Sequence, residues 1–487
     1  MRRRPNRCSA LWILPLLLVS CRSAPEPAGA PAPEERWPAG DAAAADAVRR
    51  IVGAARADDR AMERLSGLCD GIGPRLAGSV AFDRAVEWAF DELRADGLDR
   101  VALETVRIPV WERGEESLTL LEPGPPRRLP ILGLGRSVGT PAGGVTGEVV
   151  VVRDFDELER RAGEIDGKIV LFNHPMREQE NMFAAYGEAV IYRADAANRA
   201  AKHGAIAVLV RSVTTRSLRT PHTGAMREYE EGVRRIPAAA VTIEDAESFA
   251  RLAARGERIV VRLEMGARRL PEHPSANVIG ELRGREKPDE IVVIGAHLDS
   301  WDVGTGAHDD GSGVVMAMET LRLLRALDLR PRRTVRAVLF ANEEHGLDGG
   351  KTYLRDHRAE LDAHVAALES DSGGFRPVGF SFAGTDEAAA RVESWLELFA
   401  PLGELKLSRG GGGADIGPLV REGVPGLGLR VESTHYFDYH HTEADTLDKI
   451  DPAEYADALS AFAAMTWLLA ESPDPLPRAE PGAARAH

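Results

Sequence analysis

One stretch of 17 residues limits what this chain can fold into more than any other. It runs from His297 to Gly313, reads HLDSWDVGTGAHDDGSG, and contains two histidines and four aspartates. Carboxylates this close together repel one another unless a cation lies among them or some of them take up protons. The fold must therefore place this stretch where positive charge can compensate it, and the neighbouring sequence indicates where.

From residue 277 onward, apolar strand-like runs alternate with helix-like segments, a pattern typical of a parallel sheet flanked by helices. The expected strands are residues 290–296, 334–341, 364–370 and 423–431. The expected helices are residues 314–327 and a final helix that begins at Asp451-Pro452 with Glu454 in its first turn. The sequence therefore predicts an α/β fold with a mixed, mostly parallel sheet.

Polar clusters follow these strands, and Asp309 and Asp310 precede the first helix. The carboxyl ends of parallel strands share one edge of an open sheet, so we expect the clusters to meet there. Each cluster alone has an ordinary explanation, such as a helix cap, a solvated acidic pair or a structural histidine. Together, with no matching group of Lys or Arg, they indicate a metal site. The clusters are His297, Asp309-Asp310, Glu343-Glu344, Asp371 and His440-His441.

The ligand types indicate which metal this would be. Imidazole mixed with carboxylate, without thiolate, suits zinc best and leaves manganese and cobalt open. Calcium and magnesium prefer sites made of oxygen alone. Five ligands are more than an open catalytic site at one zinc requires. They fit two zinc ions about 3.5–4 Å apart, with one carboxylate bridging them.

The pattern resembles the co-catalytic di-zinc exopeptidases, which include bacterial leucyl aminopeptidases and glutamate carboxypeptidases, and the carboxypeptidase Q branch is the nearer likeness. The motifs HLDSWDVGTGAHDDGSG, EEHG, ESDSG and HHTEADT carry the resemblance in that order, and it covers about residues 41–475. It implies a zinc exopeptidase fold and two zinc ions per chain. By resemblance, the metal ligands are His297, Asp309, Glu344, Asp371 and His441.

The resemblance also implies roles for individual residues. Asp309 matches the bridging carboxylate, Glu343 the general base, and Asp299 a carboxylate that orients His297. His441 is preferred to His440 as a ligand because it stands four residues before Asp445, as the family spacing requires. His308 and His345 match no ligand position and are interpreted as structural.

Roles in substrate binding are implied for four further residues, and for each a structural role stays open. Tyr436, Tyr439 or His440 would stabilise the oxyanion, and Asp415 belongs to a glycine-rich substrate loop at Gly410–Gly413. The motifs do not decide whether the enzyme holds the amino or the carboxyl end of its substrate. An arginine such as Arg409 or Arg430 would favour a carboxypeptidase.

A β-rich module interrupts the expected catalytic domain. Short strand-like runs at residues 147–152, 167–172, 205–210 and 236–242, with a helix-like segment at 193–204, resemble the protease-associated domain, and a generic α/β insertion stays open. The expected boundaries are a catalytic N-terminal part at 41–120, the insert at 121–270, the metal-binding part at 271–475 and a disordered tail at 476–487.

The first 40 residues are expected to be a targeting segment. A basic start precedes a short apolar run that ends in Leu-Val-Ser-Cys21, which resembles a lipobox, so residues 1–21 would be a lipoprotein signal peptide and 22–40 a flexible tether. Arg22 after that cysteine favours the outer membrane, and an ordinary secretory signal stays open. Of three cysteines, only Cys69 would remain for the folded part, so no internal disulfide is expected.

The net charge of -15 argues against binding to nucleic acid. The sequence thus predicts a secreted or envelope-anchored metalloexopeptidase that hydrolyses dipeptides or short peptides and contacts the membrane only through its lipid; a homodimer stays open. An aminopeptidase of the same family is the alternative. A non-catalytic binding lipoprotein is the third hypothesis, and the intact set of ligands and base speaks against it.

Overall fold

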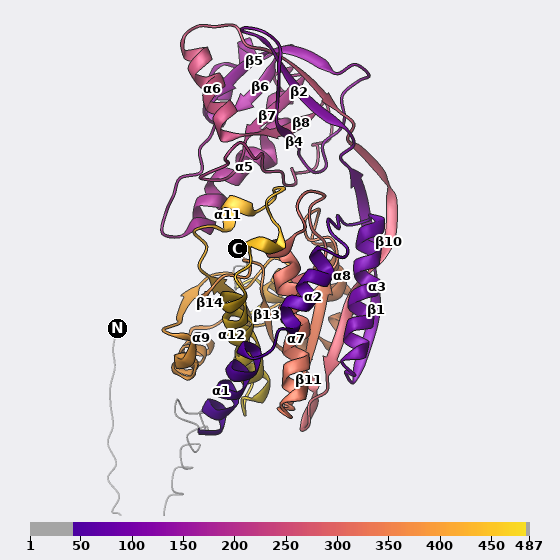
Figure 1. The fold of residues 1–487 in the computed structure, drawn as a ribbon, viewed down its shortest axis with the longest axis vertical. Coiled ribbons are helices and arrows are strands. Elements are labelled where there is room, and N and C mark those ends of the chain that lie inside the picture. The colour runs from indigo at the N-terminus through magenta and orange to yellow at the C-terminus, as the bar shows by residue number, and fades with distance from the viewer. Residues whose placement is uncertain (1–41, 484–487) are drawn as a thin grey trace, which may run out of the picture. The chain divides into compact units, whose positions relative to one another are not determined.

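The computed structural model describes residues 42–483, all of which belong to one compact unit. The expected signal peptide and tether lie outside the described residues, and so does Cys21. The described chain forms two eight-stranded sheets with helices packed on them (Figure 1). No helix between residues 42 and 483 combines the length and the apolar character needed to cross a bilayer.

The first sheet is mixed, and its four central strands are parallel. Its strands are, in spatial order, β1 (Arg100–Glu112), β10 (Arg268–Leu282), β12 (Arg333–Phe340), β11 (Lys287–His297), β13 (His364–Glu369), β16 (Gly426–Val431), β14 (Pro377–Ala383) and β15 (Lys406–Arg409). Strands β12, β11, β13 and β16 are the four predicted from their apolar runs. They are buried almost throughout, which explains why they read as continuous apolar segments rather than as alternating ones.

Helices cover this sheet, and the largest hydrophobic core lies beneath α1, α7 and α12, which pack on one another (Figure 1). Helix α12 begins as expected, because the Asp451 side chain accepts hydrogen bonds from the N–H groups of Ala453 and Glu454. The helices of this part are α1 (Ala42–Arg56), α2 (Arg60–Cys69), α3 (Val80–Ala95), α7 (Ser312–Ala326), α8 (Asp348–Asp356), α9 (Asp386–Trp395), α10 (Gly417–Arg421), α11 (Tyr436–Tyr439) and α12 (Pro452–Glu471).

The second sheet belongs to the inserted module. Its strands are, in spatial order, β3 (Arg127–Leu129), β2 (Glu116–Glu122), β9 (Val260–Met265), β5 (Val145–Val152), β6 (Ile169–Phe172), β7 (Ala207–Arg211), β8 (Ala238–Val241) and β4 (Ile131–Gly133). Its helices are α4 (Phe155–Arg160), α5 (Met182–Ala201) and α6 (Ile243–Ala254). The long antiparallel pair β1 and β10 connects this module to the first sheet (Figure 1).

Several elements differ from the sequence-based expectation. The second sheet begins with β2 at Glu116, before the expected boundary at residue 121. Helix α5 begins at Met182, eleven residues before the expected helix-like segment at 193, where Asn181 accepts a hydrogen bond from Ala184 as its cap. Strands β14 and β15 at the sheet edge were not predicted, because β15 is short and mostly exposed and carries no apolar run.

Candidate metal centre

The polar clusters meet at one edge of the first sheet, as the order of its strands requires. His297 is the last residue of β11, Glu343 and Glu344 follow β12, and Asp371 follows β13. His441 lies beyond β16, after the short helix α11. Because these strands are parallel neighbours, their carboxyl ends bring side chains together that are far apart in the sequence.

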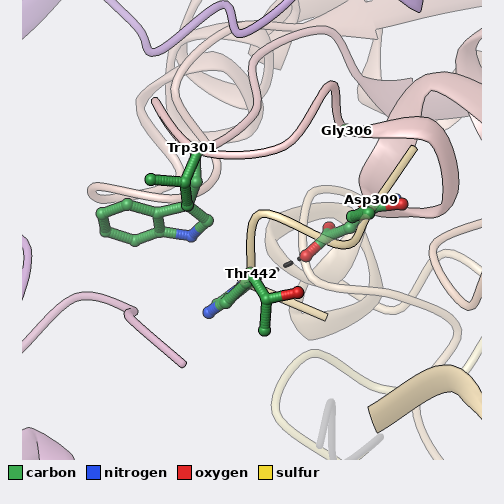
Figure 2. Close-up of a pocket in the computed structure, with 7 residues that line it drawn as sticks. Trp301, Gly306, Asp309 and Thr442 are labelled. Carbon is green, nitrogen blue, oxygen red and sulfur yellow. Dashed lines mark hydrogen bonds and ion pairs between the residues drawn. The ribbon is translucent and has the colours of Figure 1, made fainter. Parts of the chain in front are cut away.

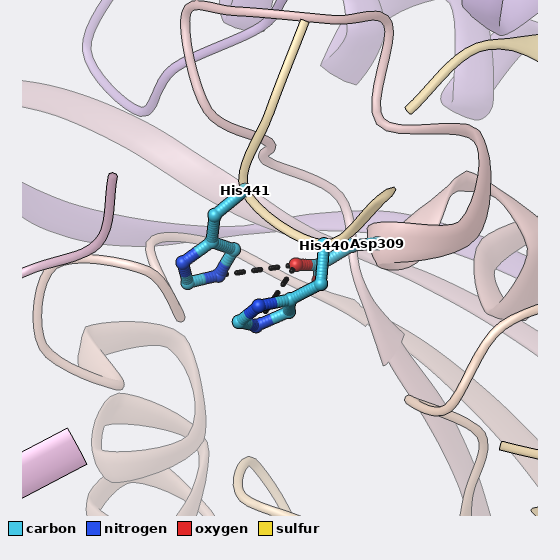
Figure 3. Close-up of side chains that lie close together, drawn as sticks. All are labelled: Asp309, His440 and His441. Carbon is cyan, nitrogen blue, oxygen red and sulfur yellow. Dashed lines mark ion pairs between the residues drawn. The ribbon is translucent and has the colours of Figure 1, made fainter. Parts of the chain in front are cut away.

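Asp309 lies at the middle of the cluster, and its two carboxylate oxygens face different histidines. Its Oδ1 is 3.1 Å from Nε2 of His297, and its Oδ2 is 3.1 Å from Nε2 of His441 (Figure 3). Asp371 lies on the His297 side, 3.6 Å from that Nε2, and Glu344 lies on the His441 side, 3.2 Å from that Nε2. The five expected ligands therefore form two groups that share only Asp309.

His440 is the less favourable of the two adjacent histidines as a ligand. Its Nε2 is 3.7 Å from Oδ2 of Asp309, and its ring stacks on that of His441 with 3.5 Å between ring centres (Figure 3). It still belongs to a group with Asp309 and His441 that could hold a metal ion. The shorter contact with Asp309 and the contact with Glu344 favour His441.

Burial and neighbouring charges both shift the pKa values of the side chains in this cluster. Burial alone would lower the pKa of His297, but Asp309 and Asp371 hold it well above its usual value. Burial raises the pKa of Glu343 well above the usual range of a carboxyl, and although His297 opposes this, Glu344 and Asp371 raise it further. A divalent cation displaces protons from such a set of histidines and carboxylates.

The residues fit a metal ion in a second respect. Within residues 42–483, Oε1 of Glu344 is buried in the cluster and has no hydrogen-bond partner. A buried carboxylate oxygen without a donor is costly, and a metal ion satisfies it. The donors are imidazole nitrogens and carboxylate oxygens, which is the set that zinc binds.

Asp299 acts differently from the expectation. The Nδ1 of His297 lies 3.0 Å from the backbone carbonyl oxygen of Asp299 and 3.8 Å from its carboxylate. That carboxylate instead accepts hydrogen bonds from the backbone N–H groups of Glu343, at 3.1 Å, and Glu344, at 3.3 Å. Asp299 thus orients His297 through its main chain and fixes the Glu343–Glu344 turn through its side chain.

The backbone at this turn and at His441 adopts conformations that non-glycine residues rarely take. Asn342 has φ 62° and His441 has φ 62°, both in the left-handed region. Such residues cost on the order of 1–3 kcal/mol each and persist where surrounding contacts fix them. Here these contacts place Glu343, Glu344 and His441 at the cluster.

Two residues that the sequence analysis did not assign hold the loop that carries Asp309. Asp445 accepts hydrogen bonds from the backbone N–H groups of His308, at 2.8 Å, and Asp309, at 3.1 Å. Arg75 is fully buried and donates to the carbonyl oxygens of residues 298, 305 and 306. Arg75 lies in the segment GIGPRLAGS, whose residues give no sign of its partners.

Trp301 was also missed, although it lies inside the motif that runs from His297 to Gly313. Its Nε1–H donates to Oε2 of Glu344 at 2.5 Å, and its ring packs on His345 and His441. Its contact with Glu344 joins residues 43 positions apart, which no sequence pattern predicts. Trp301 also lines a small pocket beside the cluster, with Val303, Gly306, Asp309, His441, Thr442 and Asp445 (Figure 2).

The residues expected to bind substrate lie at different places around the cluster. Tyr436 is buried and packs against His440, whereas Tyr439 stacks on His308. Asp415 is buried, and within the described chain neither of its carboxylate oxygens has a hydrogen-bond partner. Arg409 lies apart from the cluster, because its half-exposed side chain pairs with Asp386 at 3.2 Å.

His308 and His345 occupy structural positions in this arrangement. His308 stacks on Phe375 and accepts a hydrogen bond from the N–H group of Gly374 at its Nδ1. His345 packs between Trp111 and Trp301. Neither belongs to the two groups of potential ligands within the described residues.

Comparison with known proteins places this geometry in a family. Residues 277–466 match Peptidase family M28, and residues 145–249 match the PA domain. The chain is 44% identical over 420 residues to carboxypeptidase Q of Mus musculus, a match that covers 86% of this chain and 87% of that protein. The chain belongs to peptidase family M28. As an M28 peptidase, it is a zinc-dependent exopeptidase, as the motifs predicted.

Solved structures agree with this M28 assignment. A peptidase M28 precursor from Shewanella amazonensis superposes with a TM-score of 0.86 at 38% identity and covers 89% of this chain and 98% of its own. A zinc aminopeptidase from Bacillus subtilis has the same fold, with a TM-score of 0.62 at 21% identity, covering 84% of this chain and 94% of its own. The mixed α/β fold and the protease-associated insert are thereby confirmed.

Proposed function

We propose that this M28 peptidase uses two zinc ions to hydrolyse dipeptides or short peptides as a carboxypeptidase Q-like enzyme. His297 and Asp371 would hold one zinc, Glu344 and His441 the other, and Asp309 would bridge them. The likeness to carboxypeptidase Q over 86% of the chain supports the substrate class. An aminopeptidase of the same family is the alternative that an experiment must separate from it.

One observation carries the proposal of two metal ions. Each oxygen of the Asp309 carboxylate lies 3.1 Å from the Nε2 atom of a different histidine, and each histidine has a second carboxylate of its own beside it. A single metal ion would need the ligands on one side of Asp309 only. A carboxylate whose two oxygens serve two separate groups is the arrangement expected of a bridging ligand.

The chemistry then depends on Glu343. When bound, zinc acts as a Lewis acid and lowers the pKa of a coordinated water from about 15.7 towards about 7. Glu343 would take a proton from the attacking water and pass it to the leaving amine of the substrate. Asp299 supports this role, because its carboxylate fixes the backbone of Glu343 and Glu344 through two hydrogen bonds.

Metal analysis and a substrate panel test the proposal. The purified full-length protein should contain two equivalents of zinc and should hydrolyse a free dipeptide. The same dipeptide with a blocked amino end should remain a substrate, whereas amidation of its carboxyl end should abolish cleavage. The opposite pattern would identify an aminopeptidase. Absence of bound zinc, or of any hydrolysis with zinc supplied, would exclude the proposed function.

We further propose that the protein is exported and anchored to the outer membrane by lipid on Cys21. The support is the basic start, the short apolar run and the Leu-Val-Ser-Cys sequence, with Arg22 after the cysteine. Two or three acyl chains would anchor the protein stably, whereas one would not. Wild type should partition into the detergent phase and Cys21→Ala into the aqueous phase. Equal solubility of the two, with an unmodified N-terminus, would indicate a plain signal peptide.

A further inference from the structure

The inserted domain reaches the metal centre and contacts the segment that carries His441. Side chains of α5 and its surroundings form a small hydrophobic core with two residues of α11. That core contains Met176, Met182, Ala185, Ala189 and Val213 of the insert, with Tyr436 and Phe437 of the catalytic part. Because α11 directly precedes the His440-His441 pair, this contact anchors the segment that carries His441.

Beside this core, the insert loop 222–223 lies against the backbone of the histidine pair. The N–H group of Thr223 donates to the carbonyl oxygen of His441 at 3.0 Å. The Nδ1 atom of His222 lies 2.9 Å from the carbonyl oxygen of His440, within hydrogen-bond distance. Two successive residues of the insert are thus paired with two successive residues of the catalytic segment.

The decisive contact involves the imidazole of His441 itself. Its Nδ1 lies 3.3 Å from the backbone carbonyl oxygen of Thr223, while its Nε2 faces Asp309 and Glu344. Nη1 of Arg193 also lies near this Nδ1, at 3.5 Å, but the carbonyl contact is the shorter of the two. A carbonyl oxygen can only accept, so in the neutral ring this shorter contact favours the proton on Nδ1 and leaves the Nε2 lone pair free. A hydrogen bond of this kind, from the second ring nitrogen, fixes the orientation and tautomer of a metal-binding histidine.

Arg193 of α5 fixes that carbonyl in turn. Its Nη1 donates to the Thr223 carbonyl oxygen at 3.2 Å, and its Nη2 donates to the hydroxyl of Tyr186 at 2.7 Å. The guanidinium fits closely beneath Gly224, where a Cβ atom would lie 2.2 Å from it. Arg193 is buried, and within residues 42–483 its Nε has no hydrogen-bond partner, so it is fixed by these two contacts and by the longer approach of its Nη1 to Nδ1 of His441.

We infer that the inserted domain supplies part of the metal centre, with Arg193 as a positioning residue that acts on His441 through the Thr223 carbonyl. The inference rests on the proposed two-zinc function and assigns the insert a role in that site. Loss of Arg193 would free the carbonyl to move, and His441 would lose its orienting partner. The zinc bound by His441 and Glu344 would then be held more weakly, whereas the zinc bound by His297 and Asp371 would be unaffected.

The test is zinc retention by full-length Arg193→Met, which keeps a long side chain but removes the hydrogen-bond donors of the guanidinium. Removal of such an orienting partner typically lowers metal affinity by about 10- to 100-fold. In a chelator titration, the variant should lose one zinc at a roughly tenfold or more lower chelator concentration than the parent protein. The second zinc should be lost at the same chelator concentration as in the parent protein. Arg193→Lys, which retains a donor, should recover part of the difference.

Arg211→Met is the matched control. Arg211 is an equally buried arginine of the insert, but it pairs with Asn173 and Glu247, away from the metal centre. The Arg211→Met variant should release its zinc ions at the same chelator concentrations as the parent protein. If Arg193→Met fails to fold, His222→Leu, which removes the partner of the His440 carbonyl, is measured with the same expectation.

The possible results separate this inference from the proposed function. Parent protein without zinc would overturn the proposed function itself. Parent with two zinc ions, together with an Arg193→Met variant that retains both equally well, would overturn only the role of the insert. Equal weakening of both zinc ions, or the same loss in Arg211→Met, would also overturn it, because both results indicate general destabilisation.

Discussion

At Asp309, one carboxylate faces both halves of the metal cluster. Its oxygens lie 3.1 Å from His297 and 3.1 Å from His441, while Asp371 and Glu344 each lie beside one of these histidines only. We expect Asp309→Ala to lose both zinc ions and Asp371→Ala to lose mainly one, because the bridging carboxylate also separates two cations that repel each other. Metal analysis of the purified variants is the measurement. Two zinc ions in Asp309→Ala, with loss in Asp371→Ala, would show that Asp309 does not bridge.

Glu343 differs from its neighbour Glu344 in what it contacts. Glu344 pairs with His441, whereas Glu343 is held by Asp299 through its backbone N–H group. We expect Glu343→Gln to retain its zinc and to lose about 10²–10⁴-fold in kcat, the usual contribution of a general base. The paired control is Glu344→Gln, which should lose zinc. Full activity, or loss of a zinc ion, in Glu343→Gln would contradict its role as base.

The sequence predicts the residues that form the metal cluster but not the residues that hold those side chains in place. His297, Asp309, Glu344, Asp371 and His441 could be selected because each stands at the end of a recognisable strand or within a motif. Trp301, Arg75, Arg193 and Thr223 act through contacts across 30 to 231 positions, several of them with main-chain atoms, and such contacts have no local pattern. Asp299 illustrates the limit, because its position was noted but its backbone carbonyl, rather than its carboxylate, orients His297.

At the scale of the element, β2 of the insert carries Glu116 at a position that disfavours its ionised form. Burial raises the pKa of Glu116 to about 7, although Arg113 and the N–H group of Gly133 lower it. The folded state therefore favours the protonated form of Glu116. This contribution to the free energy of unfolding is fully present below the unfolded-state pKa of 4.5 and is lost as the pH rises through about 7. A shift of this size corresponds to at most about 3 kcal/mol.

We therefore expect Glu116→Gln, which resembles the protonated acid, to be more stable than the parent at about pH 8 and equally stable at about pH 4.5. Denaturant unfolding at the two pH values measures the difference in the free energy of unfolding. Glu115→Gln, at the exposed neighbouring position, should change neither value. A Glu116→Gln variant that is less stable than the parent at pH 8 would mean that the ion pair with Arg113 outweighs burial.

The elements that could be predicted are those whose environment is uniform along their length. Strands β11, β12, β13 and β16 are buried on both faces, so their apolar runs were clear, and α12 has a recognisable cap. Strand β15 has no buried residue, and β3 and β4 have three residues each, which is too short for a recognisable strand pattern. The first half of α5 was missed although Met182, Ala185 and Ala189 form an apolar stripe at helical spacing toward the catalytic part.

At the scale of the whole molecule, the metal centre lies where the catalytic part and the insert are in contact. Catalytic strands supply His297, Glu344 and Asp371, and the insert supplies the backbone partners of His440 and His441. Zinc that binds only the folded state stabilises it by about 2.7 kcal/mol when its free concentration is 100 times the dissociation constant. Because the ligand segments are fixed from both sides, this stabilisation should extend to the contact between insert and catalytic part.

We expect chelation to lower the Tm and zinc to restore it, while magnesium, which prefers oxygen ligands, should not. Hydrogen exchange measured with and without zinc locates the effect. Amides near His441 and in the insert loop 222–224 should lose protection together on chelation, because the N–H group of Thr223 donates to the His441 carbonyl. Amides of β5, which pairs with β6 and β9, should be unchanged. Loss of protection confined to the catalytic segment would show that the insert contacts persist without the metal and are not linked to it.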